Sequence, residues 1–498
     1  MNRSLSFIIG GICFFALLLF IPAPQIIGET GWKVIAVISL MLIWWVSEAV
    51  PVSVTALLPI LLFPVLDVIP LKQVTANYGH PIVFLFFGGF TIALAMEKWN
   101  LHTRIALAIV KKTGTHANGI ILGFMIATSF LSMWLSNTAT TVMMLPIAAS
   151  VLALVTNGLT IDELSPNVRR FALSLVLGIA FAANIGGTAT LTGTPPNTIL
   201  AGFIDDTYQF TIEYGTWMLV GVPFAITLLL LCWFVLCYVV YPSRMGNIAN
   251  AGSEIDKRYD ALGKISYNEI CVLIVFISTA ALWIFKGLLP FEIKDAAIAV
   301  TAAIVLFLIP NSKKDGFIMQ WKSNPAENDM LKMPWNILLL FGGGLSIAAA
   351  MKASGLVDVV GGQISSFSTF GVFGIVILCF LTTLFITEVM SNLALITIFL
   401  PVLAGIASNL GENPLLFVIG ATLASSCAFM LPMATPPNAI VFASGYIRIA
   451  QMVKVGIVMN ILSIILITVL SYTLASYVFG ISSNTVPEWA ANAGFISK

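Results

Sequence analysis

Residues 133–148 read MWLSNTATTVMMLPIA and residues 388–402 read EVMSNLALITIFLPV, so a Ser-Asn phrase occurs twice in apolar sequence, 255 residues apart. Each copy is followed by a second phrase, GTPPNTI at 193–199 and ATPPNAI at 434–440. Polar, helix-breaking sequence is costly inside a membrane, because unpaired backbone groups find no water there. Its presence at matching places in two halves predicts a binding site made from broken helices, as in secondary transporters.

The composition is that of a polytopic membrane protein. Hydrophobic residues make up 59% of the 498 residues and charged residues only 9%, which excludes an ordinary soluble domain. Stretches such as 215–241 and 452–477 exceed the roughly 18 apolar residues that a membrane-spanning helix needs. No small-residue cleavage site follows the first stretch, 6–22, so we expect a retained helix there rather than a signal peptide.

Several classes of function lack their residues. The six cysteines stand singly in apolar segments, which is typical of neither a disulfide framework nor a metal site. The three histidines, at 80, 102 and 116, have unrelated spacings. A net charge of +1 and the absence of a basic tract give no reason to expect a nucleic-acid partner. No nucleophile–base pair stands in the apolar segments, so we expect no enzyme activity and no cofactor.

Two polar, basic intervals divide the chain. They are 242–268 and 311–334, and two apolar segments between them allow both to lie on one side of the membrane. The positive-inside rule places them in the cytoplasm, together with the 98–112 stretch. The predicted organisation is an N-terminal part with a first repeat (1–241), a basic cytoplasmic loop (242–268), connecting membrane segments (269–310), a second basic loop (311–334), and a second repeat with the C-terminal segment (335–498).

A single offset of 255 supports an internal duplication. It aligns Gly88 with Gly343, Ser132 with Thr387, Asn137 with Asn392, and Pro146 with Pro401. The TPPN phrases are 241 apart, so a net 14 residues are extra in the first copy, and we expect them in the loop LTIDELSPNVRRF at 159–171. Short, interrupted apolar segments beside both Ser-Asn phrases favour re-entrant hairpins over complete crossings.

The Ser-Asn phrases are suited to binding an anion. Serine and asparagine are strong N-cap residues, and apolar helix-forming sequence follows each phrase. A helix that begins there presents free N–H groups and the positive end of its dipole, which favour a carboxylate, phosphate or sulfate. Two such helix starts, one per repeat, can hold both ends of a dianion. The competing interpretation is that each phrase merely caps a helix at a membrane kink.

The TPPN phrases are suited to binding a cation. Two successive prolines remove two backbone donors and release the carbonyls just upstream, at Gly193 and Ala434. With hydroxyl and amide oxygens from the Ser-Asn regions they form a neutral, all-oxygen set that favours Na⁺. A plain proline kink is the alternative.

Charge connects the two kinds of site. No Lys or Arg lies within the four phrases, and helix dipoles compensate a dianion only in part. Bound cations would complete the compensation, and a basic residue from elsewhere is the competing solution. Among the isolated acids Glu48, Glu97 and Glu388, the last precedes Ser391 by three residues. It is therefore placed to orient a hairpin tip through hydrogen bonds.

From about residue 33 to 477 the chain resembles the divalent anion:sodium symporter (DASS) family, most specifically in SNTATTVMMLPIA, GTPPNTI, TEVMSNLALITIFLPV and ATPPNAI. The resemblance implies an all-α polytopic fold in the bilayer, with a scaffold domain and a transport domain of two inverted repeats. Each repeat would carry a re-entrant hairpin with the Ser-Asn phrase at its tip. It also implies a homodimer and transport by an elevator movement of the site.

The resemblance further implies site residues. The first sodium site would comprise Ser132, Ser136, Asn137 and Gly193, and the second Thr387, Met390, Asn392 and Ala434, with Met390 and Ala434 giving backbone oxygens. The substrate carboxylates would meet residues of all four phrases: Ser136, Asn137, Thr138, Thr194 and Pro195 from one repeat, and Ser391, Asn392, Leu393, Thr435 and Pro436 from the other.

The expected function is secondary transport of dicarboxylates, such as succinate, malate, fumarate or 2-oxoglutarate, by sodium symport. Citrate and sulfate stay open as substrates. A sodium-independent dicarboxylate exchanger of the same family is the alternative, and an anion channel is less favoured.

The residue at 393 generates a prediction, because many family members carry a hydroxyl there and this chain has Leu393. We expect Leu393→Thr to transport, and to rank competing di- and tricarboxylates differently from the wild type, since it adds one hydrogen-bond donor to the second half-site. Competition against labelled succinate uptake in proteoliposomes measures the ranking. Identical competition profiles for the two proteins would contradict the assignment.

Overall fold

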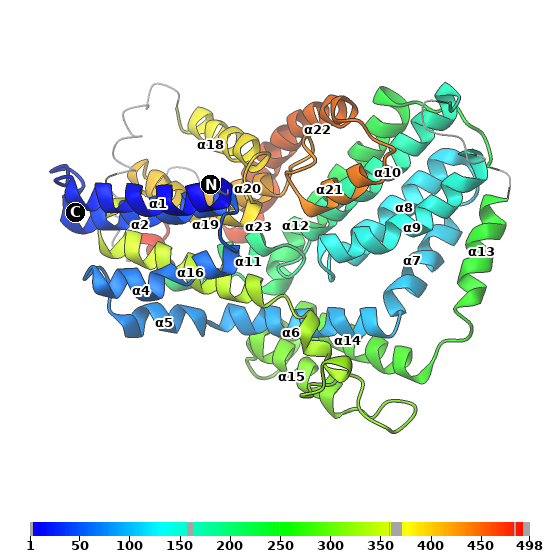
Figure 1. Cartoon of the computed structure of the whole chain (residues 1–498), viewed down its shortest axis with the longest axis horizontal. Helices are drawn as coiled ribbons and strands as arrows, with labels where there is room; N and C mark the ends of the chain where they lie inside the picture. Colours follow the sequence, from blue (N-terminus) through cyan, green and yellow to red (C-terminus); the bar gives the residue numbers. More distant parts are fainter. Residues whose placement is uncertain are drawn as a thin grey trace.

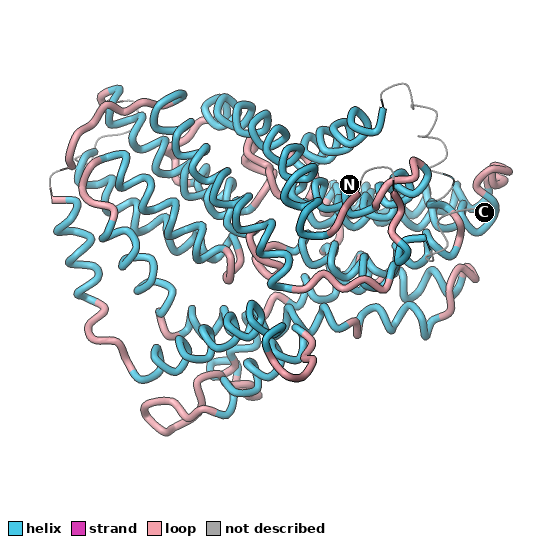
Figure 2. The backbone as a smooth tube through the Cα atoms, turned by 180° about the vertical axis from the view of Figure 1, so that it is seen from behind, coloured by secondary structure: helices cyan, strands magenta, loops and turns pink. Residues whose placement is uncertain are grey.

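The computed structural model describes residues 3–156, 163–248, 250–357, 359, 371–482 and 485–491. These residues form helices joined by loops, and no β-strand occurs among them (Figures 1 and 2). Nine of the described helices are long and apolar enough to cross a membrane, and six further apolar helices are shorter. The prediction of an all-helical polytopic membrane protein is confirmed.

One group of helices comes from the N-terminal part and from the middle of the chain. α5 (Leu71–Tyr78) packs on α16 (Trp335–Ala353), and α6 (Pro81–Lys98) packs on α15 (Asp295–Leu308) and α14 (Tyr267–Phe285). At one end of this group α1 (Arg3–Phe20) lies against α2 (Gly28–Ser47). The short helices α3 (Val52–Thr55) and α4 (Leu58–Val65) pack against α16 as well.

Each Ser-Asn phrase lies at the turn between two helices. The first turn joins α8 (Ala117–Ser132) to α9 (Asn137–Thr156), and the second joins α18 (Gly371–Thr387) to α19 (Asn392–Asn409). Each TPPN phrase begins the second half of an interrupted helix. These pairs are α10 (Pro166–Gly187) with α11 (Pro195–Tyr208), and α20 (Pro414–Ser425) with α21 (Pro436–Ala443).

The interrupted helices cross between the repeats. α10 packs on α8 and α9 of its own repeat and on α21 of the other, as Figure 1 shows. In the same way, α20 packs on α18 and α19 and on α11. α21 also contacts α9, and α11 contacts α19. Each TPPN helix therefore lies against the Ser-Asn helix of the opposite repeat, which brings all four phrases into one region.

The hairpin helices and the interrupted helices form a second group, which two further helices complete. α12 (Tyr214–Phe234) continues as a π-helix at Val235–Val240, and α22 (Ile449–Leu470) continues as a π-helix at Ser471–Ala475 and then as α23 (Ser476–Phe479). α12 packs against α10 and α22. α24 (Glu488–Ala491) is the last described helix.

The expected position of the 14 extra residues is only partly right. Part of the segment 159–171 lies outside the described residues. However, α10 begins at Pro166, 28 residues before Thr194, whereas α20 begins at Pro414, 21 residues before Thr435. The difference, 28 − 21 = 7, places half of the extra residues between the start of α10 and Thr194, where α10 has 22 residues against 12 in α20. The loop alone does not hold them, because α10 is longer than α20.

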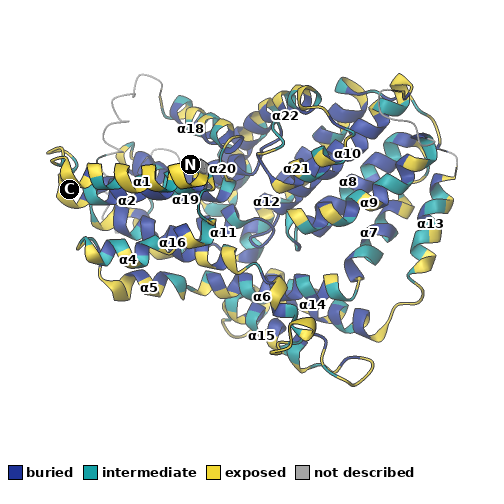
Figure 3. Ribbon diagram, in the orientation of Figure 1, coloured by how far each residue is buried: buried dark blue, intermediate teal, exposed yellow. Residues whose placement is uncertain are grey.

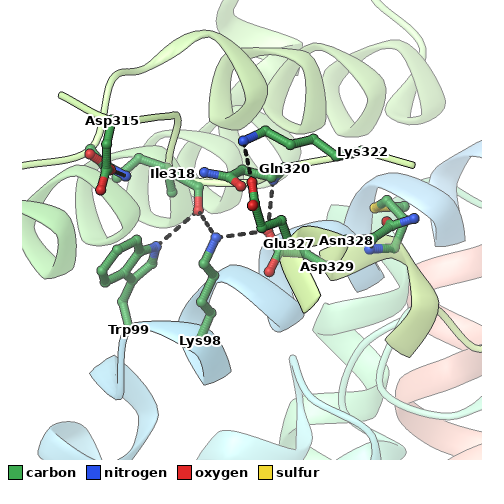
Figure 4. A network of polar contacts seen from close by, with 11 residues as sticks. Lys98, Trp99, Asp315, Ile318, Gln320, Lys322, Glu327, Asn328 and Asp329 are labelled. Carbon is green, nitrogen blue, oxygen red and sulfur yellow. Dashed lines mark hydrogen bonds and ion pairs between the residues drawn. The ribbon is translucent and has the colours of Figure 1, made fainter. Parts of the chain in front are cut away.

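The three basic segments lie on one face of the molecule. Lys98, at the end of α6, donates to Asp329 Oδ2 at 2.7 Å and to the Ile318 carbonyl at 3.0 Å in the 311–334 segment (Figure 4). On α7 (Leu101–Lys112), Arg104 donates to Glu269 Oε1 at 2.7 Å and to the Gly263 carbonyl at 3.0 Å. The hydrogen bond that Arg104 donates to Glu269 raises the pKa of the Arg104 guanidinium, which keeps its charge.

The 242–268 segment contains a helix as well as loops. α13 (Ala251–Ala261) packs on α7 and α9. A capping box between Ser266 and Glu269 starts α14 at Tyr267, so the helix includes the last two residues of the predicted loop, 267 and 268. The expectation of a simple loop was wrong here, because the apolar face of α13, with buried Ala251 and Ile255, has a partner to pack on.

The paired glycines of α6 and α16 allow neighbouring segments to approach these helices closely. The centre of α6 is buried (Figure 3). A Cβ on Gly88 would lie 2.3 Å from the Ala299 carbonyl oxygen of α15, and a Cβ on Gly343 would lie 2.6 Å from the Ala56 carbonyl oxygen. Small residues at these positions let the backbones touch, which is how helices associate in membranes.

We expect Gly88→Val to lower the thermal unfolding midpoint of the purified protein in detergent, since overpacking at a backbone contact costs about 1–3 kcal/mol or more. Gly10→Val is the matched control, because a Cβ on Gly10 of α1 meets no atom within 4 Å. Equal midpoints for the two variants would contradict this account of the α6–α15 contact.

Candidate functional site

A cluster of three oxygen atoms lies at the first Ser-Asn turn. The Ser132 hydroxyl at the end of α8 is 2.6 Å from Asn137 Oδ1 and 2.8 Å from the carbonyl oxygen of Ala183 in α10. Ser132 is fully buried. The cluster therefore joins the hairpin tip to the interrupted helix of the same repeat.

The second repeat builds the same cluster from different residues. The Thr387 hydroxyl at the end of α18 is 2.7 Å from Asn392 Oδ1 and 2.7 Å from the carbonyl oxygen of Ser425 in α20. Thr387 is also fully buried. The duplication seen in the sequence is thus a duplication of local chemistry.

Each cluster is suited to a cation. A hydroxyl carries one proton, so Ser132 or Thr387 can donate to one of its two neighbouring oxygens and not to both. The other contact brings two lone-pair oxygens together, which is unfavourable unless a positive charge lies between or beside them. Hydroxyl, amide and backbone carbonyl oxygens are the ligands that a hard cation prefers, so the residues present fit Na⁺.

Gly193 lies near the first cluster through Gly187. A Cβ built on Gly187 would fall 2.6 Å from Asn137 Oδ1 and 3.0 Å from the Gly193 carbonyl oxygen. The Gly193 carbonyl accepts no hydrogen bond from any described residue. Two predicted ligands therefore flank one small space that a side chain at 187 would fill. In the second repeat no hydrogen bond joins the backbone oxygens of Met390 or Ala434 to Thr387 or Asn392 within the described chain.

The asparagine of each TPPN phrase closes the break in its helix. Asn197 Nδ2 lies 3.3, 3.2 and 2.8 Å from the carbonyl oxygens of Gly187, Thr188 and Thr190. Asn438 Nδ2 lies 3.0 and 3.1 Å from the carbonyl oxygens of Ala428 and Leu431. The Thr188 carbonyl also accepts from Trp217 Nε1 and the Leu431 carbonyl from the Ala434 N–H. For the carbonyls of Gly187, Thr190 and Ala428 the amides supply the donors that the interrupted helices lack.

The two helix starts differ in their caps. Ser136 Oγ accepts from the Ala139 N–H at 3.2 Å, as an N-cap side chain does. Ser391 stands at the N-cap of α19, but its side chain makes no capping hydrogen bond. The expectation of a capping side chain was therefore wrong for Ser391, which is exposed and leaves the first-turn N–H groups of α19 without a side-chain acceptor.

The other predicted substrate residues fall into three groups by exposure. Thr138 and Pro436 are exposed, Asn137, Asn392 and Pro195 are half-buried, and Thr194, Thr435 and Leu393 are buried. Contacts of α21 with α9 and of α11 with α19 bring these residues into one region. The exposed positions stand at the two hairpin tips and at the start of α21, where a ligand can reach them.

Glu388, which the sequence predicts to orient the hairpin tip, binds the break of the second interrupted helix. Its carboxylate accepts from the N–H groups of Phe429, Met430 and Leu431 at 2.9–3.2 Å, and from Asn460 Nδ2 of α22 at 2.8 Å. Its counterpart at the offset of 255 is Met133, whose carbonyl accepts from the Thr190 hydroxyl. The other two acids differ, because Glu48 is exposed and Glu97 lies at the end of α6.

Sequence reasoning missed three components of the site. The carbonyls of Ala183 and Ser425 gave no signal, because a backbone oxygen belongs to every residue type. The amides of Asn197 and Asn438 were visible in the TPPN phrases, and their role follows once unpaired carbonyls upstream are considered. Asn184, which reaches the second repeat, stands alone in an apolar helix and could have been found as a buried polar residue.

The protein-family model of the sodium:sulfate symporter transmembrane region matches residues 4–481 of the sequence. The chain belongs to the sodium:sulfate symporter family. The family resemblance read from the four phrases is confirmed, and the protein is a multi-pass membrane transporter rather than an enzyme.

Two sodium-dependent dicarboxylate transporters named SdcS are similar over nearly their whole length. The one from Staphylococcus saprophyticus is 40% identical over 480 residues, which cover 95% of this chain and 91% of the relative. The one from Staphylococcus aureus strain USA300 is 40% identical over 494 residues, covering 97% and 93%. The Alcanivorax borkumensis YdaH transporter matches the fold with a TM-score of 0.52 at 14% identity, over 82% of this chain and 88% of that one.

We expect Glu388→Ala to destabilise the protein severely, since three buried N–H groups would lose their acceptor at about 1–3 kcal/mol each. Thermal unfolding in detergent measures the effect. Glu97→Ala, at the end of α6, is the control and should unfold like the wild type. An unfolding midpoint for Glu388→Ala equal to that of Glu97→Ala would contradict an anchoring role.

Proposed function

We propose that the protein is a sodium-coupled transporter of dicarboxylates. The observation that carries this proposal is the repeated cluster of a hydroxyl, an amide oxygen and a backbone carbonyl at the two Ser-Asn turns. The SdcS relatives are named sodium-dependent dicarboxylate transporters, and we take the proposed substrate class and coupling cation from them. Each cluster would hold one Na⁺, with Ser132 and Asn137 in one and Thr387 and Asn392 in the other.

The anion would lie between the two cation sites. The helix starts at Asn137 and Asn392 present N–H groups, and Thr194 and Thr435 stand at the N-caps of α11 and α21. Both threonines are followed by two prolines, so the first-turn donors of these helices are reduced and the hydroxyls become the main donors there. Bound cations beside Asn137 and Asn392 would compensate the charge of a dianion, because none of the four phrases contains Lys or Arg.

Two inverted repeats account for the way the hairpins are placed. α8 begins beside the basic segment 242–248, where the Ile248 N–H donates to the Thr115 carbonyl. The end of α19 lies beside Val357, which follows α16, a helix that begins at the basic face and ends at the other. The two hairpins therefore enter from opposite faces and would meet in the membrane as re-entrant structures. We place the basic face in the cytoplasm.

A cavity supports a division into a scaffold and a moving domain. Its volume is about 770 Å³, and it lies on the face away from the basic segments. One wall comes from His80 and Leu85 of α6 and from Asp295 of α15, and the other from Leu191 and Asp205 of the first repeat. Such a space between two groups of helices is what an elevator movement needs. We propose in addition that the α1–α6 and α14–α16 group forms a homodimer contact.

Sodium-independent exchange of dicarboxylates is the second candidate function. It would require a basic residue to replace the cations at the anion site. The described residues place no Lys or Arg in contact with the Ser132 or Thr387 cluster, which favours the symporter.

We expect uptake of labelled succinate into proteoliposomes to rise steeply with external Na⁺ and to stop when choline replaces it. Asn137→Ala and Asn392→Ala should nearly abolish uptake, because each removes the amide oxygen of a cation site. Ser132→Ala and Thr387→Ala should weaken the apparent affinity for Na⁺ more than the affinity for succinate at saturating Na⁺. Sodium-free counterflow driven by internal dicarboxylate would instead establish the exchanger.

A further inference from the structure

Asn184 connects the two repeats at the candidate anion site. It lies in α10, next to the Ala183 carbonyl of the first oxygen cluster, and is 1% exposed. Its Nδ2 is 3.0 Å from the Thr435 hydroxyl and 3.4 Å from Asn438 Oδ1, both in the second TPPN phrase. A polar side chain at this depth is costly unless its hydrogen bonds compensate it.

The neighbouring groups fix the direction of these hydrogen bonds. Asn438 uses its Nδ2 for the carbonyls of Ala428 and Leu431, so the atom that it turns to Asn184 is the acceptor Oδ1. Asn184 must then present its own N–H₂ group on this side, because two amide oxygens would repel each other. The Thr435 oxygen lies beside that same N–H₂ group and is therefore the acceptor.

The consequence concerns the proton of Thr435. A hydroxyl has one proton and two lone pairs, and Asn184 occupies one lone pair. Within the described residues Thr435 Oγ1 donates to no protein acceptor. Its proton is therefore left for a ligand that can only accept, which is what an ionised carboxylate does.

We propose that Asn184 is a positioning residue that holds the Thr435 hydroxyl as a hydrogen-bond donor to one substrate carboxylate. This inference rests on the proposed dicarboxylate transport, and it assigns to a residue of the first repeat a function in the half-site of the second. It also ties the two repeats together, so that the Thr435 half-site is complete only when α10 and α21 are packed.

No described residue of the second repeat makes the corresponding contact to the first TPPN phrase. Ser426, which follows the accepting carbonyl of Ser425, stands at the position that corresponds to Asn184. The Ser426 hydroxyl is buried without a partner. The two half-sites also differ at the Ser-Asn phrases, where Thr138 corresponds to Leu393. The half-site that has Leu393 instead of a hydroxyl residue is thus the one in which the Asn184 amide holds the hydroxyl of Thr435. A single fixed donor there makes carboxylate binding depend on Thr435.

The test compares succinate affinities of the purified full-length protein at saturating Na⁺, measured from the succinate-dependent rise of its thermal unfolding midpoint. Asn184→Ala should weaken the apparent affinity about tenfold, since a charge-assisted hydrogen bond of ordinary strength loses its orientation. Ser426→Ala is the matched control and should bind succinate like the wild type. In a Thr435→Ala background, Asn184→Ala should weaken binding no further, because no hydroxyl remains to be oriented.

Asn184→Leu, which keeps the volume of the side chain and removes the donor, repeats the comparison if the alanine variant does not fold. An equal loss of affinity in the Thr435 and Thr435→Ala backgrounds would overturn the proposal in favour of simple packing, and so would wild-type affinity in both Asn184 variants. If the wild-type protein neither binds nor transports succinate, the proposed function fails and this inference with it. Wild-type transport without coupling between 184 and 435 overturns this inference alone.

Discussion

The structure depends on one constraint, namely that backbone polar groups inside a membrane must find partners within the protein. The two interrupted helices depart from the usual solution, because several carbonyls at their breaks, such as those of Gly187, Thr190 and Ala428, have no helical donor. Asn197 and Asn438 supply donors to those carbonyls, and Glu388 accepts from the N–H groups of 429–431. With these three side chains in place, backbone oxygens can be left free where a ligand needs them.

The same constraint explains why the oxygen clusters stand where they do. A serine or threonine at the end of the first hairpin helix meets the asparagine of the turn and one carbonyl of the interrupted helix. Each cluster has one hydroxyl proton for two close contacts between oxygen atoms, so a cation beside these oxygens would stabilise it. In the proposed symport, cation binding, anion binding and the packing of the hairpin on its interrupted helix would form one coupled equilibrium.

The two repeats are most alike in their hydroxyl–amide–carbonyl clusters, and they differ most in the hydrogen bonds that hold each turn. The first turn is held by the Thr190 hydroxyl on the Met133 carbonyl and the second by the Glu388 carboxylate. Among the described residues, Asn184 of the opposite repeat donates hydrogen bonds to the second TPPN phrase, and no side chain of the second repeat does so to the first. The two half-sites proposed for a dicarboxylate therefore differ, and selectivity among anions would arise from this difference.

The sequence by itself determined the membrane class, the duplication and the four phrases, which follow from composition, from one constant offset and from residue types that are expensive in a bilayer. The pairs of Ser132 with Asn137 and Thr387 with Asn392 were implied by the family resemblance. The tertiary structure alone decided which carbonyls complete the clusters, that α13 is a helix, that Ser391 does not cap α19, and that Asn184 reaches Thr435. Backbone carbonyls carry no signature in the residue types, and contacts across repeats depend on how α10 and α21 cross, which no local pattern encodes.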